Sequence, residues 1–405
     1  MAKIDDSVKK SPELRFAGFT DDWEERKLGE ITTSFSGGTP SAGNSSYYKG
    51  DIPFIRSGEI NSDKTELFLT EAGLKNSSAK MVSVGDILYA LYGATSGEVG
   101  ISQINGAINQ AILAIKPCDG YNSHFLMQWL KLQKQKIIDK YLQGGQGNLS
   151  GSIVKNLVLN VPSYEEQQKI GVFFKQLDDT IALHQRKLDL LEEQKKGFLQ
   201  KMFPKNGAKV PELRFAGFTD DWEERKLGDL LNKNSEKNKN LSVINVESVS
   251  NKTGFTKQTD QFKDYSVASV DLSNYYVIRE KQFAYNPSRI NVGSIAYKDL
   301  GDEISVVSPL YVSFSTKKVL NDGFLWNWFK TASFDAQRQR LSEGGVRDTL
   351  SFNQLSEMNI MFPTYPEQEK IGSFFKQLDD TIALHQRKLD LLKEQKKGFL
   401  QKMFV

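Results

Sequence analysis

Side chains that can hydrogen-bond to base edges gather in the turn-rich parts of this chain, between short apolar runs. Arg pairs bidentately with guanine, and Asn or Gln with adenine, in the major groove of DNA; Lys and Arg also bind phosphates regardless of sequence. Taken singly, each such residue is better explained by turn chemistry or a solvated charge, so the prediction depends on the set. The candidates are Ser36, Thr39, Ser41, Tyr92, Thr95, Asn109, Gln110, Gln143, Gln146 and Asn148, and further along Asn286, Ser288, Arg289, Asn291, Arg338, Arg340 and Arg347.

Residue patterns for catalysis are missing from the same sequence. There is no G-x-x-x-x-G-K-[ST] phosphate loop, and the glycines from Gly145 onward are spaced one place too widely for a dinucleotide fingerprint. Asn286-Pro287 is not followed by the second proline and aromatic residue of an adenine methyltransferase motif. One cysteine and three dispersed histidines cannot form a zinc cluster. We therefore expect a recognition module with no catalytic residue, metal or cofactor of its own.

Composition and charge restrict the class of protein only loosely. The chain of 405 residues carries 53 basic and 50 acidic side chains, a net charge of +3, so any basic groups that meet DNA must cluster on one face. The lone Cys118 excludes a disulfide framework and fits a reducing cytoplasm. The N-terminus has no apolar signal core, and no run approaches the roughly 20 apolar residues of a membrane helix. We expect a cytoplasmic protein that does not bind membranes.

The elements that must position the candidate residues form a duplicated frame around two different inserts. The 18 residues at 12–29 recur letter for letter at 211–228, and Glu166–Phe203 recurs as Glu367–Phe404 with three differences. The inserts, about 30–161 and 229–362, are similar only in a few short segments, which we call the skeleton. In the skeleton, GDILYA matches KQFAYN, FLMQWL matches FLWNWF, and a glycine pair precedes Leu-Ser in both inserts. We predict recognition domains at 12–163 and 205–364, with repeated helices at 164–204 and 365–405.

The long repeated segments have the periodicity of coiled-coil helices. A strict period of seven is typical of helices that pack along one another. The 39 residues from 165 to 203 would span about 58 Å, and two copies could pair antiparallel and relate the inserts by a pseudo-twofold axis. The alternative is that each helix packs only on its own domain. The predicted contact positions are Ile170, Phe174, Leu177, Ile181, His184, Leu188 and Leu191 in the first copy and Ile371, Phe375, Leu378, Ile382, His385, Leu389 and Leu392 in the second.

Four polar residues interrupt this apolar contact surface. His184 and His385 are better explained as packed histidines than as metal ligands or a pH switch. Lys195 and Lys396 fit a role in fixing the helix register or meeting a partner.

Each insert is predicted to form short strands followed by an amphipathic helix, near Ser123–Leu142 in the first and near Phe324–Leu341 in the second. The fold class is therefore α+β, with two α/β-type domains and two long helices.

With these features the chain resembles the specificity subunit of Type I restriction-modification systems. The resemblance covers nearly the whole chain. It is carried by LRFAGFTDDWEERKLGE, by PSYEEQQKIGVFFKQLDDTIALHQRKLDLLEEQKKGFLQKMF, and by SGGTPS, GDIPFIRSGEI and GAINQAIL in the first insert. It implies that each insert is a target-recognition domain that reads one half of a split sequence in double-stranded DNA, with the helices setting the unread spacer.

The resemblance also implies partners. Two methyltransferase subunits would dock on the repeated frame and two ATP-driven restriction subunits would join them, so that S-adenosylmethionine, ATP and Mg²⁺ would act in those subunits. Two alternatives from other classes are a two-headed scaffold that binds protein or carbohydrate, and a nuclease that acts alone. DNA binding with and without a methyltransferase separates the first, and metal-dependent cleavage would reveal the second.

Overall fold

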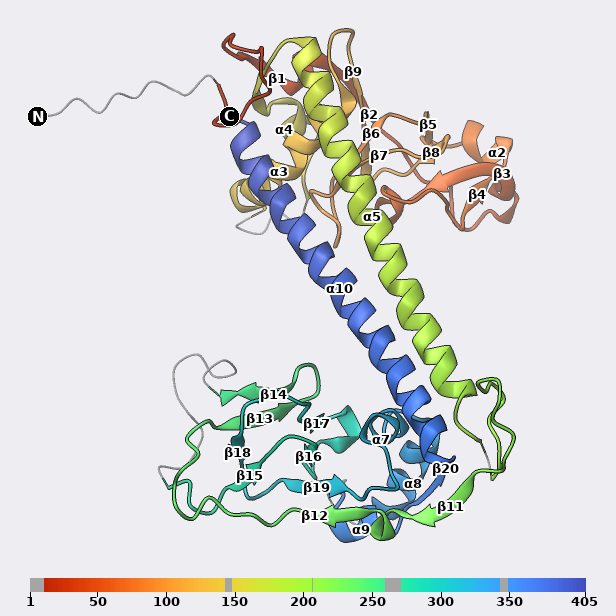
Figure 1. The fold of residues 1–405 in the computed structure, drawn as a ribbon. Helices are drawn as coiled ribbons and strands as arrows, with labels where there is room; N and C mark the ends of the chain where they lie inside the picture. The colour runs from red at the N-terminus through yellow and green to blue at the C-terminus, as the bar shows by residue number, and fades with distance from the viewer. Residues whose placement is uncertain (1–10, 143–147, 206, 259–270, 343–348) are drawn as a thin grey trace, which may run out of the picture. The chain divides into compact units, whose positions relative to one another are not determined.

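The computed structural model describes residues 11–142, 148–205, 207–258, 271–342 and 349–405 (Figure 1). The chain forms two compact units. The first consists of Met1–Gln185 with Arg387–Val405, and the second of Arg186–Gln386. Each unit thus combines one insert with the beginning of one long helix and the end of the other.

The first unit contains two four-stranded sheets. One has the order β2-β9-β6-β7, all antiparallel, and the other the order β4-β3-β8-β5, in which β3 and β8 are parallel. A separate ribbon pairs β1 (Glu24–Lys27) with β10 (Val158–Val161). The remaining strands are β2 (Thr32–Ser36), β3 (Tyr48–Ile55), β4 (Phe68–Leu69), β5 (Lys80–Val82), β6 (Ile87–Ala90), β7 (Val99–Ile101), β8 (Gly106–Ile108) and β9 (Ile112–Pro117), and the helices are α1 (Leu28–Ile31), α2 (Glu71–Lys75), α3 (Ser123–Tyr141), α4 (Gly151–Lys155) and α5 (Tyr164–Lys201).

The second unit repeats one of these sheets and replaces the other. The order β12-β19-β16-β17 corresponds to β2-β9-β6-β7, and β11 pairs with β20 as β1 pairs with β10. In place of the second sheet are two ribbons, β13-β14 and β15-β18. The strands are β11 (Glu223–Lys226), β12 (Leu231–Lys233), β13 (Glu247–Ser250), β14 (Gly254–Lys257), β15 (Tyr276–Ile278), β16 (Gln282–Tyr285), β17 (Ile295–Tyr297), β18 (Ser305–Val307), β19 (Val312–Thr316) and β20 (Asn359–Phe362), and the helices are α7 (Asp322–Trp328), α8 (Ala332–Ser342), α9 (Phe352–Ser356) and α10 (Tyr365–Met403).

The strand match and the Leu-Ser match predicted between the two inserts are confirmed, while the two glycine pairs lie outside the described residues. Tyr89 in β6 pairs with Leu113, and Tyr285 in β16 pairs with Val312. Both tyrosines are fully buried. The Leu-Ser pairs that follow the glycines begin α4 and α9, where Ser150 and Ser351 cap the helices by accepting a hydrogen bond from the backbone N–H three residues on.

The helix predicted in the second insert is interrupted. The first insert has one helix, α3, close to the predicted bounds, but the second has α7 and α8 with a break after Trp328. The Thr331 hydroxyl donates to the Trp328 carbonyl (2.7 Å) and accepts from the Phe334 amide (3.4 Å). Thr331 therefore acts as an N-cap that starts a new helix. The prediction of one continuous helix was wrong here because the hydrophobic period hides a local capping signal.

The ends of the long helices complete the cores of the units. In the first unit, Phe404 at the end of α10 packs against Phe125 and Phe174, and lies in a core with Trp23 and Ile170. In the second unit, Phe203 at the end of α5 packs against Phe324 and Phe375. Each helix end thus lies on the beginning of the other helix, which confirms the antiparallel pairing.

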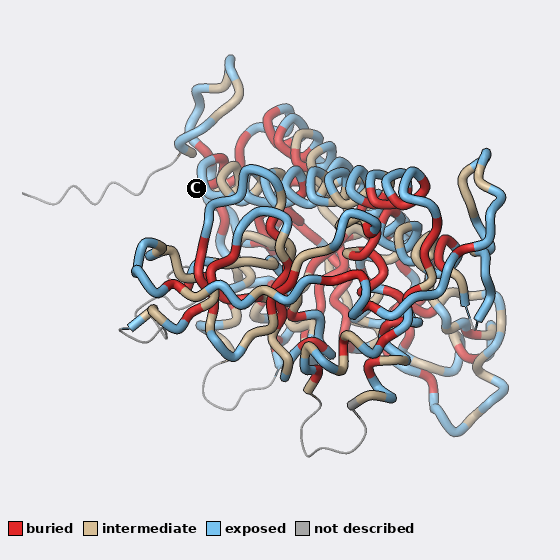
Figure 2. Tube along the Cα trace, turned by 60° about the horizontal axis from the view of Figure 1, so that its bottom comes forward, coloured by how far each residue is buried: buried red, intermediate tan, exposed pale blue. Residues whose placement is uncertain are grey.

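Burial along the two long helices follows the predicted spacing. All fourteen predicted contact positions are buried or half-buried, including His184 and His385, while Leu183, Leu190, Leu384 and Leu391 are exposed. Figure 2 shows this alternation of buried and exposed segments along the helices. Among the described residues, no helix combines the length and the apolar character needed to cross a membrane.

The repeated 18-residue motif ties both helices together in each unit. The Leu14 amide donates to the Lys402 carbonyl at the end of α10 (2.8 Å), which satisfies a helix-end acceptor. The neighbouring Arg15 forms a bidentate pair with Glu166 in the first turn of α5, at 2.7 and 2.8 Å. Leu213 and Arg214 make the same contacts with Lys201 and Glu367 in the second unit. Identical motifs therefore serve identical helix junctions.

Candidate nucleic-acid interface

Each unit has an equivalent corner in its copy of the repeated sheet. This corner lies just beyond the end of β6 in the first unit and of β16 in the second. In the first unit the Leu149 amide donates to the Leu91 carbonyl (2.8 Å), and in the second the Leu350 amide donates to the Pro287 carbonyl (3.1 Å). Leu91 and Pro287 each lie two residues after the buried tyrosine of the strand. The backbone at this corner is therefore equivalent in the two units, although the side chains differ.

Four predicted residues meet at the corner of the first unit. The Thr39 hydroxyl donates to the Gln110 side-chain oxygen (2.5 Å), and Tyr92 is hydrogen-bonded to the same side chain. Asn148 forms an isolated antiparallel bridge with Tyr92. Burial raises the pKa of the Tyr92 phenol, an effect partly offset by the Gln110 hydrogen bond, so the phenol stays protonated at neutral pH. We call Thr39, Tyr92, Gln110 and Asn148 the first corner.

A close backbone crossing positions the first corner. The Gly38 amide donates to the Ile108 carbonyl (3.2 Å), and a Cβ at Gly37 would lie 1.9 Å from that oxygen. Only glycine fits this crossing, which brings Thr39 next to Gln110. The Asn109 side chain accepts a hydrogen bond from the Ala111 amide (3.1 Å), so it shapes the turn that presents Gln110. The SGGTPS and GAINQAIL segments thus meet here.

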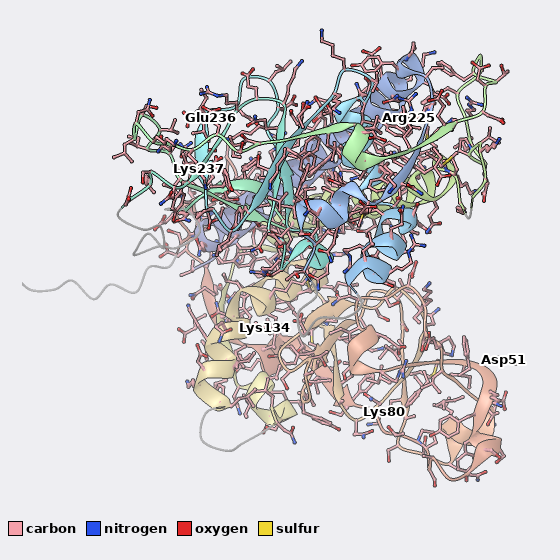
Figure 3. All side chains as sticks on the ribbon, turned by 90° about the horizontal axis from the view of Figure 1, so that it is seen from below. Asp51, Lys80, Lys134, Arg225, Glu236 and Lys237 are labelled. Carbon is pink, nitrogen blue, oxygen red and sulfur yellow. The ribbon has the colours of Figure 1, made fainter. Side chains whose placement is uncertain are left out.

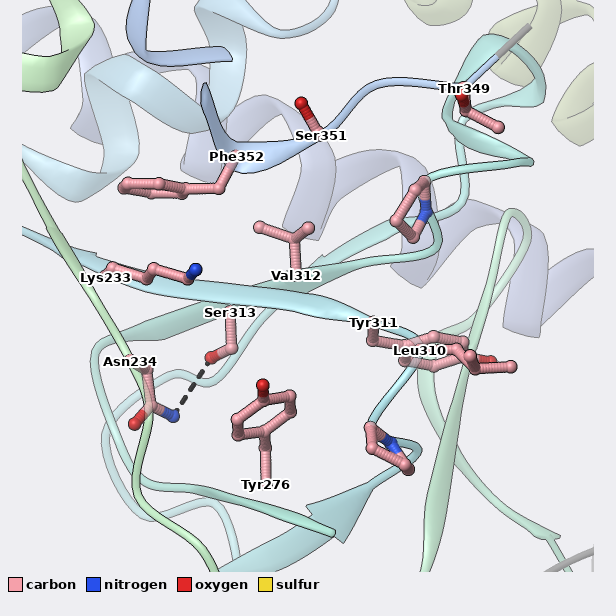
Figure 4. Close-up of a pocket in the computed structure, with 12 residues that line it drawn as sticks. Lys233, Asn234, Tyr276, Leu310, Tyr311, Val312, Ser313, Thr349, Ser351 and Phe352 are labelled. Carbon is pink, nitrogen blue, oxygen red and sulfur yellow. Dashed lines mark hydrogen bonds between the residues drawn. The ribbon is translucent and has the colours of Figure 1, made fainter. Parts of the chain in front are cut away.

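The equivalent corner of the second unit is a hollow of about 340 Å³ lined by both apolar and polar side chains (Figure 4). Pro309 lies three residues before Val312, as Gln110 lies three before Leu113, so strand register makes these positions equivalent. Leu310 beside it is 80% exposed and lines the hollow. We call the residues that line this hollow the second corner: Lys233, Asn234, Tyr276, Pro287, Pro309, Leu310, Tyr311, Val312, Ser313, Thr349, Ser351 and Phe352.

Lysines accompany aromatic rings near both corners. Lys80 and Lys116 lie over Phe35, 5.5 and 5.7 Å from the ring centroid, in the strand that leads to Gly37. In the second corner, Lys237 lies over Tyr276 at 3.7 Å and Lys233 over Phe352 at 5.7 Å. Figure 3 labels Lys80 and Lys237. Such ammonium groups can bind phosphates, which carry no sequence information. The polar side chains of the corners can instead form hydrogen bonds with base edges.

Other predicted residues lie in turns near the corners. Ser36 ends β2, the exposed Ser41 follows the crossing, and Thr95 lies in the turn between β6 and β7. The Asn286 side chain accepts from the Ser288 amide (3.1 Å), so it organises the turn around Pro287. Arg289 and Asn291 are exposed, the first just before the short helix Ile290–Val292 and the second within it.

The arginines of α8 do not join the second corner. Arg338 is buried and pairs with Asp335 at 2.7 Å, so its guanidinium is already engaged within the protein. Arg340 is exposed on the same helix, and neither residue lines the hollow. Gln143, Gln146 and Arg347 lie outside the described residues.

Sequence reasoning missed the apolar residues of the second corner. Pro309 and Leu310 carry no hydrogen-bonding side chain, so a search for base-edge donors and acceptors passes over them. The available signal was their position, immediately before a strand that matches the one after Gln110. Within the described parts of the chain, no group of three or more His, Cys, Asp or Glu side chains is arranged to hold a metal ion.

Comparison with known proteins gives the family. The model of the Type I restriction modification DNA specificity domain matches residues 20–193 and again 219–394. The chain is 25% identical to the Type I restriction enzyme MjaIX specificity subunit of Methanocaldococcus jannaschii, over 94% of this chain and 92% of that one. It is 28% identical to the HindI specificity subunit of Haemophilus influenzae over 39% of this chain and 37% of the relative.

A solved structure gives the fold. The crystal structure of the Type-I restriction-modification system S subunit from M. genitalium matches with a TM-score of 0.67 at 16% identity, covering 98% of this chain and 99% of that one. Together with the two matched domains, this likeness accounts for both inserts and both long helices. The chain belongs to the Type I restriction-modification specificity subunits, which are the non-catalytic, DNA-recognising components of those systems.

Proposed function

We propose that each unit reads one half of a bipartite DNA sequence through its corner, and that the paired helices set the unread spacer between the halves. The observation that carries this proposal is that one backbone scaffold presents different side chains in the two units. A pair of readers for two unlike half-sites needs this arrangement, because the DNA backbone they approach is the same while the bases differ.

The chemistry of the corners favours different bases. The exposed amides of Gln110 and Asn148 can each donate to and accept from adenine in the major groove. Leu310 and the prolines of the second corner instead suit the methyl group of thymine, with Lys233 available for a nearby phosphate. The first corner would therefore read by hydrogen bonds and the second largely by apolar contact.

The repeated frame supports docking of two methyltransferase subunits, one on each copy. Two copies of one partner need two equivalent surfaces. The exposed strands β1 and β11 have the same sequence, and the outer faces of α5 and α10 carry equivalent exposed leucines, Leu183 with Leu384 and Leu190 with Leu391. The assembly would form in the cytoplasm and add two restriction subunits, with S-adenosylmethionine, ATP and Mg²⁺ bound in the partners.

Base reading can be tested by replacing one corner residue at a time. The target is first mapped from methylated adenines in the DNA of cells that carry the wild-type system. In the complex with its methyltransferase, Gln110→Ala should lower discrimination at one half-site by roughly tenfold to a hundredfold, since a bidentate pair contributes about 1–3 kcal/mol. Leu310→Ala should affect only the other half.

The control is Gln135→Ala, which removes an exposed amide from α3 in the same unit. This variant should read both halves as the wild type does. The proposal is wrong if Gln110→Ala leaves both halves unchanged, or if Gln110→Ala and Leu310→Ala weaken the same half. Failure of the wild-type complex to bind DNA would favour a protein-binding scaffold instead.

A further inference from the structure

A half-buried charged cluster joins three elements in the first unit. Asp178 of α5 accepts a hydrogen bond from Lys396 of α10 (2.5 Å) and another from the Gln128 amide of α3 (2.7 Å). Lys131, one helical turn after Gln128, lies 4.0 Å from the same carboxylate. The side chains of Lys396 and Asp178 are only 15% and 30% exposed. We call Lys131, Asp178 and Lys396 the first triad.

The second unit contains the same cluster. Asp379 of α10 pairs with Lys195 of α5, and Lys330 lies 3.6 Å from its second oxygen. Lys330 also lies over the Trp326 ring, 4.4 Å from the centroid. Asn327 stands where Gln128 stands in the first unit, but its shorter amide donates to the Gly323 carbonyl (2.7 Å). Lys195, Lys330 and Asp379 form the second triad.

The origin of each lysine is informative. Lys195 and Lys396 belong to the repeated frame, and their positions interrupt the apolar contact surface of the helices. Lys131 and Lys330 belong to the two inserts, whose sequences otherwise differ widely. Each insert has nevertheless kept a lysine three residues after a buried amide residue. Each insert therefore presents one lysine to a carboxylate of the frame that already pairs with a lysine of the opposite helix.

Helix pairing alone does not require this arrangement. The helix ends are already held by Phe404 and Phe203 and by the repeated motifs. An apolar residue at Lys195 or Lys396 would serve the helix contact at no desolvation cost. What the charged cluster adds is a directional link, because one carboxylate holds the opposite helix with one oxygen and the insert with the other.

We propose that Asp178 and Asp379 are positioning residues, each of which aligns one insert with both long helices and so aims one reading corner. The inference rests on the proposed function, since it concerns how the corners are presented to DNA. Each aspartate acts within its own unit. Loss of one carboxylate should therefore affect the reading of one half-site and leave the other half intact.

The test uses the full chain in complex with its methyltransferase. Asp178→Asn should reduce discrimination at the half-site read by the first insert by roughly tenfold, the size typical of residues that act through others. Asp379→Asn should do the same for the other half-site. The controls Asp179→Asn and Asp380→Asn change the adjacent exposed carboxylates and should leave both halves unchanged.

A second measurement does not depend on DNA. In Asp178→Asn, the backbone amides of α3 should exchange with solvent faster, while those of α7 should keep the wild-type rate. The double variant Asp178→Asn with Lys396→Gln should recover part of the discrimination, because a neutral amide pair restores a hydrogen bond without an unpaired charge.

The outcomes separate the two proposals. If the wild type reads both halves and Asp178→Asn changes neither the half-site discrimination nor the exchange of α3, the positioning role is overturned and the reading function stands. Equal losses at both halves would also overturn the positioning role, because they indicate a general stabilising contact. If the wild type discriminates at neither half, both proposals fail.

Discussion

Truncation of Phe404 to alanine should destabilise the first unit and spare the second. Phe404 lies at the far end of the sequence from the insert that it supports, yet it is only 5% exposed. Its ring centroid lies 5.2 Å from that of Phe125, 6.0 Å from Phe174 and 6.3 Å from Trp23. Removing the ring would open a cavity between the sheet side of the unit and the long helices.

The expected cost can be estimated from this packing. Buried Phe→Ala substitutions cost about 3–5 kcal/mol. Because Phe404 follows the last turn of α10, its neighbours can partly close the gap, and we expect a value of about 3 kcal/mol. For a unit of this size each kcal/mol lowers the melting temperature by about 2–4 °C. The first unit should therefore melt roughly 6–12 °C lower.

Hydrogen exchange reports each unit separately in the intact chain. In Phe404→Ala the amides of β6 (Ile87–Ala90) should lose protection, while those of β16 (Gln282–Tyr285) keep theirs. The matched variant is Phe203→Ala, whose ring occupies the same place in the second unit, and it should show the opposite pattern. Leu391→Ala, at a 54% exposed position of α10, is the control for a general effect on the helix. Equal loss of protection in β6 and β16, or no loss in either, would refute the packing argument.

Three further predictions follow from the same contacts. A chain that ends at Pro204 should form a symmetric dimer, because Met202 and Phe203 of one copy can fill the place of Met403 and Phe404 in the other; a monomer at high concentration in sedimentation would contradict this. Desolvation and the neighbouring Lys195 lower the pKa of Lys330 from 10.5 to about 8, so its charge destabilises the folded state below pH 8 and this effect fades as the pH rises toward 10.5. Lys330→Met should therefore raise the unfolding temperature at pH 7 more than at pH 10. An equal effect at both pH values would exclude this cause. Tyr285→Phe should be neutral or stabilise by about 1 kcal/mol, because its buried hydroxyl has no hydrogen-bond partner among the described residues. Tyr297→Phe should destabilise the protein, because it removes the hydrogen bond to Asp322. Equal changes in the free energy of unfolding, measured by denaturant unfolding, would contradict this prediction.

Much of the fold could be predicted because its signals are local or repeated. The heptad spacing identified both long helices, and the fourteen positions that it selected, the two histidines among them, are all buried or half-buried. The exact repeats identified the frame, and the weak match between GDILYA and KQFAYN located equivalent strands. Thr331 shows the limit, since a single hydroxyl that caps a new helix divides a segment whose hydrophobic pattern looks continuous.

The candidate site could be predicted only in part. Thr39, Tyr92, Gln110 and Asn148 were each identified by residue type, but nothing in their spacing showed that they meet, while Arg338 has the right side chain and is held by Asp335. Pro309 and Leu310 became candidates only when strand register placed them at the position of Gln110.

The sequence by itself determined the duplication, the helix pairing surface and the α+β class, because periodicity and repetition act between residues close along the chain. The tertiary structure decided which distant residues share a corner, which aspartate holds which lysines, and which helix end fills which core. Those outcomes depend on strand order and register, and these are set by packing between segments far apart in sequence.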